Sequence, residues 1–205
     1  MRKLIVAEHI SLDGVIQSPG GPEEDPSGEF RLGGWIVPYA DEVIGQALQA
    51  LFSQPFELLL GRCTYEIFAA YWPRVQVDSA GHAIADLFIS VPKHVATHRS
   101  DTLDWQNSHA LEGELADAIR ALKHQDGADL LTWGSGDMVR QLLAAGLVDE
   151  FWFLIYPVVL ARSKRLFVDN AQSVGLHPRA LDHYAWRCAD HPLCAQRRGA
   201  HRDVR

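Results

Sequence analysis

Hydrophobic residues along the chain follow two spacings, one typical of buried strands and the other of amphipathic helices. Short apolar runs bounded by turn residues predict strands at residues 2–10, 56–60, 93–97, 129–133 and 150–156. Apolar residues three or four positions apart predict helices at residues 41–54, 62–72, 81–88, 110–125 and 137–145. Strands that alternate with helices favour a mainly parallel sheet with helices on both faces. We therefore expect an α/β fold in which the first strand is central.

Residues 17–35 interrupt this alternation. Their five glycines, three prolines and four acidic residues cannot sustain a regular element. Loops of this length inside a compact domain often act as lids or binding segments, and a disordered surface segment is the alternative.

The composition is that of an ordinary globular protein: 205 residues, of which 47% are hydrophobic and 22% are charged. A formal charge of −7 argues against a broad binding surface for nucleic acid or an anionic membrane. No run approaches the roughly 18 apolar residues of a membrane span, and the start of the chain turns polar after Ala7. Three cysteines do not make a disulfide framework. We expect a cytoplasmic protein with neither a membrane span nor a signal peptide.

The composition shifts near residue 176. The last 29 residues hold six arginines, no lysine and four of the ten histidines. We expect one domain at residues 1–176 and an atypical basic tail at residues 177–205, with a possible strand at residues 180–188. The Cys-x2-His-x2-Cys spacing in this tail matches none of the usual zinc patterns, so we expect no metal site.

A glycine-rich turn gives the clearest local signal for a binding site. In LLTWGSGDMVRQLL, residues 130–143, a predicted strand runs through Gly134, Ser135 and Gly136 directly into a predicted helix. Free backbone N–H groups at a helix N-terminus can donate hydrogen bonds to a phosphate, and the spacing suits a pyrophosphate. A plain tight turn is the alternative, because the pattern is shorter than a full dinucleotide fingerprint and Asp137 would repel a phosphate unless it caps the helix.

Two further strand ends carry polar turns. Gly61, Arg62 and Thr64 follow the second predicted strand, where arginine offers a fork for a phosphate and threonine a hydroxyl donor. Alternatively, Thr64 caps the helix and pairs with Glu66. Thr97 and His98, with Arg99, follow the next strand. Because ligands of open α/β sheets bind outside the carboxyl ends of the strands, the three turns could converge on one ligand.

The chain resembles the dihydrofolate reductase-like superfamily, most closely the stand-alone relatives of the C-terminal reductase domain of the riboflavin-biosynthesis deaminase/reductase. The resemblance runs in family order over residues 2–168. The segments that carry it are RKLIVAEHISLDGVIQ, GGWIVPYAD, LLLGRCTYEIFAAYWP, KHVATHR, WGSGDMVRQLLAAGLVDEFWFLIYPVVL and KRLF. It implies a mostly parallel central sheet, NADPH as cofactor, and hydride transfer to a C=N or C=O bond of a pteridine- or pyrimidine-like substrate.

Carried over position by position, the resemblance implies nine cofactor-binding residues. They are Ala7 beside the nicotinamide, Gly61, Arg62 and Thr64 at the adenosine-phosphate turn, Thr97 and His98 near the 2′-phosphate, and Gly134, Ser135 and Gly136 at the pyrophosphate turn.

Three residues are the implied catalytic candidates. Trp35 and Asp41 match the tryptophan and the active-site acid of the dihydrofolate reductases, and Asp13 lies in the SLDG turn over the cofactor. Asp13 in an ordinary Asp-Gly turn and Trp35 as a packing residue are the alternatives.

Departures from the family narrow the expected function. Riboflavin-pathway reductases usually have a glutamate before the glycine turn, where this chain has Trp133, so we do not expect it to use the riboflavin intermediate itself. We expect an NADPH-dependent reductase of a small heterocycle; a catalytically silent nucleotide-binding or sensor module and a structural dimer unit are the alternatives. Bulky side chains at Phe151, Trp152, Phe153 and Tyr156 favour a homodimer.

Overall fold

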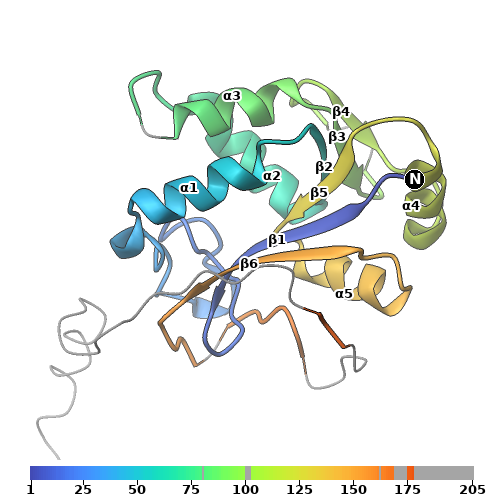
Figure 1. Ribbon diagram of the computed structural model, residues 1–205. Helices are drawn as coiled ribbons and strands as arrows, with labels where there is room; N and C mark the ends of the chain where they lie inside the picture. Colours follow the sequence, from blue (N-terminus) through green and yellow to red (C-terminus); the bar gives the residue numbers. More distant parts are fainter. Residues whose placement is uncertain (80, 100–102, 162, 169–174, 178–205) are drawn as a thin grey trace, which may run out of the picture. The chain divides into compact units, whose positions relative to one another are not determined.

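Six parallel strands form the sheet around which residues 1–171 fold (Figure 1). In this computed structural model the described residues are 1–79, 81–99, 103–161, 163–168 and 175–177. The chain divides into two units, Met1–Ala171 and Gln172–Arg205. The predicted boundary between residues 176 and 177 stays a prediction, and the predicted strand at residues 180–188 and the tail's cysteines lie outside the described residues.

The order of the strands across the sheet is β4-β3-β2-β5-β1-β6, and each neighbouring pair is parallel. The strands are β1 (Leu4–Ser11), β2 (Phe56–Gly61), β3 (Lys93–Ala96), β4 (Ser108–Ala110), β5 (Asp129–Trp133) and β6 (Glu150–Tyr156). β1 lies between β5 and β6, so the first strand is paired on both sides, although it lies next to the edge strand β6 rather than at the centre of the sheet.

Helices cover both faces of the sheet, as predicted. Helices α1 (Glu42–Leu51), α2 (Arg62–Tyr71) and α3 (His82–Ser90) lie on one face, and α4 (Leu115–His124) and α5 (Gly136–Ala144) on the other (Figure 1). Short 3-10 turns occur at Ser27–Glu29, Val37–Tyr39 and Trp72–Arg74. None of these helices, which are those of the described residues, has the length and apolar character needed to cross a membrane.

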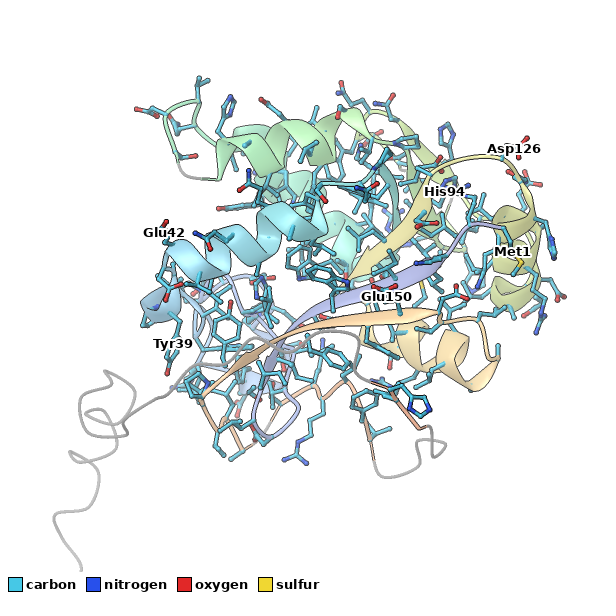
Figure 2. The ribbon with its side chains drawn as sticks, in the orientation of Figure 1. Met1, Tyr39, Glu42, His94, Asp126 and Glu150 are labelled. Carbon is cyan, nitrogen blue, oxygen red and sulfur yellow. The ribbon has the colours of Figure 1, made fainter. Side chains whose placement is uncertain are left out.

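Alternating residues of the strands fill two cores. Leu58, Leu60 and Leu131 pack against Phe88 of α3. Leu59 and Leu130 point the other way and pack with α4 and α5. Side chains fill the space on both sides of the sheet (Figure 2). The α/β class is therefore confirmed, and both faces of the sheet are buried, as parallel sheets require.

The sequence pattern missed strand β4 and placed the start of the following helix too early. Residues 108–110 (Ser-His-Ala) carry no apolar alternation, yet they pair with β3. Gly113 follows with a φ of 77°, and α4 begins at Leu115 rather than at residue 110. Pairing with β3 decides the conformation of this segment, and local spacing cannot show it.

Strand β6 is an edge of the sheet within the described residues. Its aromatic side chains find partners in the same chain: Phe151 and Phe153 pack with Phe167, and Tyr156 packs with His9. Ile155 is 61% exposed. The homodimer therefore stays a prediction.

Lys93 is a fully buried lysine at the start of β3. Its ammonium group donates hydrogen bonds to the carbonyl oxygens of Ile89, Val91 and Gln106 at 3.1, 2.8 and 3.1 Å. It also lies 4.3 Å from the centre of the Trp105 ring, within cation–π range. These contacts join the end of α3 to the segment before β4.

We expect Lys93→Met to lower the free energy of unfolding by about 2 to 4 kcal/mol, because buried carbonyl groups lose their donor. Urea denaturation measures the loss. Lys3→Met is the matched control, since Lys3 is exposed and its ammonium group pairs with Glu150; it should change stability by less than about 0.5 kcal/mol. Equal effects of the two variants would contradict the anchoring role of Lys93.

Candidate functional site

The carboxyl ends of β2, β3 and β5 open onto a cavity of about 1680 Å³. The three strands are neighbours and parallel, so the turns that follow them lie at one edge of the sheet. Eight of the nine predicted cofactor-binding residues line the cavity: Gly61, Arg62, Thr64, Thr97, His98, Gly134, Ser135 and Gly136. The ninth, Ala7, is 1% exposed, pairs with Trp133 across the sheet, and does not line the cavity.

Ser135 joins the turn after β5 to the turn after β2. Its Oγ accepts a hydrogen bond from the Gly61 N–H at 2.8 Å and donates one to the Thr64 hydroxyl at 3.0 Å. The Ser135 backbone is left-handed, with a φ of 63°. The alternative in which Thr64 caps the helix and pairs with Glu66 is wrong: α2 has no side-chain cap, the Thr64 hydroxyl contacts Ser135, and Glu66 pairs with Arg62.

The close approach of the two turns requires glycine at two positions. Gly134 has a φ of 73°, and a Cβ there would lie 3.1 Å from the Thr64 hydroxyl. At Gly61 a Cβ would lie 3.2 Å from the Ser135 side chain. Helix α5 begins at Gly136, so its unpaired N–H groups open beside this junction. Asp137 in its first turn pairs with Arg140, which offsets the acidic charge.

Two arginines pair with one carboxylate near the start of helix α2. Arg62 Nε lies 2.8 Å and Arg99 Nη2 3.3 Å from Glu66 Oε1. The Arg62 guanidinium also donates to the Arg99 carbonyl at 3.0 Å, and the Arg99 N–H donates to the Thr97 hydroxyl at 3.0 Å. Arg62 and Arg99, which we call the arginine cluster, thus join the turn after β2 to the turn after β3.

None of the three predicted catalytic residues lines the cavity. Asp41 is exposed and caps α1, accepting hydrogen bonds from the N–H groups of Val43 and Ile44 at 3.1 and 3.0 Å. Trp35 is buried and donates from Nε1 to the Gln17 carbonyl at 2.8 Å. Both residues nevertheless lie near Tyr156, as described below.

Asp13 holds the turn after β1 to the segment after β6. Its carboxylate accepts hydrogen bonds from the Ser11 hydroxyl and from the N–H groups of Leu160 and Ala161, at 2.7, 3.1 and 2.8 Å. Burial raises the pKa of Asp13, but these hydrogen bonds outweigh it and keep the pKa below its usual range. This geometry gives Asp13 a positioning role.

Glu8 was missed by sequence reasoning. It lies on β1, is 2% exposed and lines the cavity. Burial raises its pKa from 4.5 to about 8, although a hydrogen bond from the Gly134 N–H opposes the shift. Its Oε1 is buried without a partner among the described residues. Strand alternation places Glu8 on the same face as Val6 and Ile10, which is the α5 side of the sheet. Its one signal in the sequence is a carboxylate within an apolar strand.

His9 points to the opposite face and was also missed. It lines the cavity, and its ring centre lies 5.0 Å from that of Trp133. Its Nδ1 is 2.9 Å from the Tyr156 hydroxyl. Burial lowers the pKa of His9 from 6.5 to about 3, so the imidazole is neutral at ordinary pH.

Tyr156 is 2% exposed and lies among aromatic rings. Trp35 and Tyr39 meet it edge-on, with ring centres 5.4 and 5.7 Å away. Burial, and then the negative charge of Asp41, raise the pKa of Tyr156. The structure therefore brings two of the predicted catalytic residues, Trp35 and Asp41, around the partner of His9 rather than to the cavity itself.

An aromatic wall continues from Trp133 along the α1–α3 side of the cavity. We define this wall as Phe68, Trp72, Phe88 and Trp133. Phe88 stacks on Phe68 at 5.6 Å and meets Trp72 at 4.9 Å, and its ring centre lies 6.4 Å from that of Trp133. Leu48 and Ile84 also line the cavity.

Gln17 organises the loop at residues 17–35. Its side-chain amide donates to the carbonyls of Asp25 and Ser27, each at 2.9 Å. Its Oε1 accepts from the Ser163 hydroxyl at 2.9 Å and the Lys164 N–H at 3.1 Å. The first part of this loop, through residue 25, lines the cavity. Residues 17–25 therefore form one wall of the cavity, and the alternative of a disordered segment is wrong.

Within the described part of the chain, no group of three or more His, Cys, Asp or Glu side chains could hold a metal ion.

Comparison with known proteins gives one family match and three similar proteins. Residues 2–191 match the family model of the RibD C-terminal domain. An uncharacterized protein YyaP of Bacillus subtilis (strain 168) is 25% identical over 175 residues, which cover 85% of each chain. The crystal structure of a putative riboflavin biosynthesis protein from Shewanella sp. PV-4 matches with a TM-score of 0.52 at 19% identity, covering 84% of this chain and 87% of that one. Schistosoma mansoni dihydrofolate reductase gives a TM-score of 0.47 at 12% identity, over 91% of this chain and 92% of that one.

The buried Glu8 carboxyl predicts a pH-dependent stability. The folded state keeps a proton that the unfolded state releases between pH 4.5 and about 8, so stability should fall as the pH rises through this range. Glu8→Gln stays neutral and should be more stable than the parent at pH 8, by about 3 to 5 kcal/mol, with the difference disappearing near pH 4.

Urea denaturation at pH 4, 6 and 8 measures this difference. Glu112→Gln, at an exposed position, is the control and should follow the pH profile of the parent. A Glu8→Gln profile parallel to that of the parent would show that Glu8 is ionised in the folded protein.

Proposed function

Because the chain belongs to the RibD C-terminal domain family, whose fold is reductase-like, we propose that it is an NADPH-dependent reductase that transfers a hydride to a C=N or C=O bond of a pteridine- or pyrimidine-like heterocycle. The observation that carries the proposal is the convergence of three strand-end turns on one cavity. A dinucleotide is long enough to contact all three, whereas a single phosphate is not.

The junction of the two glycine turns suits a pyrophosphate. The positive φ of Gly134 and the missing Cβ leave room for close backbone approach, and the N-terminus of α5 supplies N–H groups and a partial positive charge. Glu8 lies beside this turn, close enough for the Gly134 N–H to act on its carboxyl group. In its protonated form it does not repel the phosphate charge.

The arginine cluster suits the 2′-phosphate of NADPH. Arg62 and Arg99 both pair with Glu66, so a phosphate that joins the cluster gains charge-assisted hydrogen bonds that NADH cannot form. Arg99 extends a turn whose Thr97 and His98 line the cavity.

The part of the cavity outside the proposed phosphate contacts suits a flat substrate. When bound, NADPH supplies the hydride, and the protein supplies orientation and electrostatics. The aromatic wall offers faces against which a planar ring can lie. The loop held by Gln17 covers the cavity on another side and would limit access of water to the reacting atoms.

A catalytically silent nucleotide-binding module is the second candidate. It is favoured by the position of Asp13 and Asp41 outside the cavity lining, because the residues expected to supply acid catalysis do not reach it. NADPH titration followed by turnover assays on a panel of pterins separates the two: binding without turnover on any substrate favours the silent module.

We expect the protein to bind NADPH at least ten-fold more tightly than NADH, and Arg62→Ala to remove most of this preference. The lost charge-assisted contact is about 1.5 to 3 kcal/mol. Fluorescence titration with both cofactors measures it. Arg120→Ala is the control, because Arg120 pairs with Asp117 on α4 away from the cavity lining. A parent protein with equal affinity for both cofactors would contradict the assignment of the 2′-phosphate site.

We expect Gly134→Ala to weaken NADPH binding by ten-fold or more, because the added Cβ crowds Thr64 at the phosphate turn. Gly146→Ala is a matched control. Gly146 has a similar φ of 66° but open space around its Cα, so both variants carry the same backbone strain of about 1 kcal/mol while only one touches the cavity. Calorimetric titration of the folded variants tests this, and equal affinities would make the glycine turn purely structural.

A further inference from the structure

We propose that His9 donates a hydrogen bond from Nε2 to the acceptor heteroatom of an uncharged, planar substrate that lies along the aromatic wall, and that Tyr156 fixes the imidazole tautomer this requires. The inference rests on the proposed function for the reaction, and it adds a substrate class and the residue that contacts the reacting bond.

The contact between His9 and Tyr156 sets the tautomer. The Tyr156 hydroxyl lies 2.9 Å from His9 Nδ1, so one of the two groups donates to the other. A phenol is the stronger donor and a ring nitrogen the better acceptor, which makes Nδ1 the acceptor of the Tyr156 O–H. The proton of the neutral ring is then on Nε2.

The position of the ring leaves Nε2 available to a ligand. His9 lines the cavity, whereas Tyr156, on its Nδ1 side, does not. Among the described residues, Nε2 has no hydrogen-bond partner, and it is not among the buried polar atoms that lack one. Contact with Trp133 at 5.0 Å places the donor at the end of the aromatic wall.

Tyr156 is held rigidly enough to serve as a positioning residue. Trp35 and Tyr39 meet its ring edge-on, and Trp35 is itself fixed by its hydrogen bond to Gln17. The charge of Asp41 disfavours ionisation of the phenol, which keeps its proton available for His9. Trp35 and Asp41 thus act through Tyr156 and His9.

The wall determines the class of substrate. Its four members, Phe68, Trp72, Phe88 and Trp133, carry no charge, and their neighbours Leu48 and Ile84 are aliphatic. An anionic substituent lying against this wall would lose its hydration without gaining a cationic partner there. A flat, uncharged ring with one carbonyl or imine group matches the wall and its one polar donor.

The chemistry of reduction matches a neutral donor. The carbon of the C=O or C=N bond gains a hydride, the electron pair of the double bond moves to the heteroatom, and a proton from water completes the product. His9 stabilises the charge that develops on the heteroatom and keeps its own proton, as a neutral imidazole can do in a buried site.

NMR of the full chain with 15N-labelled histidine tests the tautomer without cofactor or turnover. Long-range 1H–15N spectra, with His9 assigned by its loss in His9→Gln, should show a protonated Nε2 and an unprotonated Nδ1. In Tyr156→Phe, thermal melting checks folding and the His9 signals should shift toward the mixed tautomer of a free imidazole. A protonated Nδ1 in the parent would overturn the proposal.

Calorimetric titration with isatin and isatin-5-sulfonate tests the substrate class, since both are planar fused-ring ketones and only the second carries an anion. We expect isatin to bind at least ten-fold more tightly, and His9→Ala to weaken isatin binding about ten-fold, as loss of a hydrogen bond of roughly 1.4 kcal/mol would. His9→Gln retains an N–H donor and should recover part of the affinity.

The exposed His109→Ala is the control and should bind isatin like the parent. Equal binding of the two ketones, no binding of isatin, or an unchanged His9→Ala would overturn the proposal. NADPH affinity should be the same in the parent and His9→Ala. If the parent does not bind NADPH, the proposed function fails independently of the isatin result.

Discussion

The close approach of the turn after β5 to the turn after β2 is the constraint on which the site depends. One serine hydroxyl, on Ser135, satisfies the Gly61 N–H and the Thr64 hydroxyl at once. For this to happen Ser135 adopts a left-handed backbone, and a Cβ at Gly61 or Gly134 would crowd the side chain that faces it. The junction sets the start of α5, and with it the direction in which the free N–H groups open. Loss of any one of these features would separate the two turns.

Strand β1 places one uncharged polar side chain beside the glycine turn of the cavity and another beside its aromatic wall. Successive residues of a strand point to opposite faces, so Glu8 faces the phosphate turn and His9 faces the aromatic wall. Burial acts in opposite directions on their pKa values: it raises that of the acid to about 8 and lowers that of the base to about 3. One physical cause therefore keeps both side chains neutral without an ion pair.

Local signals explain what could be predicted from the sequence. Strand–glycine–helix junctions are encoded within a dozen residues, so the turns at Gly61 and Gly134 and their shared edge followed from spacing and topology. Long-range packing explains the rest. The environment of Glu8 and His9 is created by residues more than a hundred positions away in the chain. The capping role of Asp41 is local to the start of α1, whereas its proximity to Tyr156 becomes visible only in the structure. Family resemblance indicated Trp35 and Asp41 as catalytic candidates; in the structure they lie beside Tyr156 and do not line the cavity.

The pairing of β1 also has a consequence for biosynthesis. Leu4 pairs with Leu130 in β5, and Ile5 with Glu150 in β6, so among the described strands β1 is made before the others and its two neighbours are made after the others. Strands β2 and β3 can associate earlier because they are close in the chain. During translation β1 therefore stays unpaired, and prone to aggregation, until β5 and β6 have been made and it can pair with both. Completion of the sheet and completion of the cavity are then the same event, since Glu8 and His9 enter with that strand.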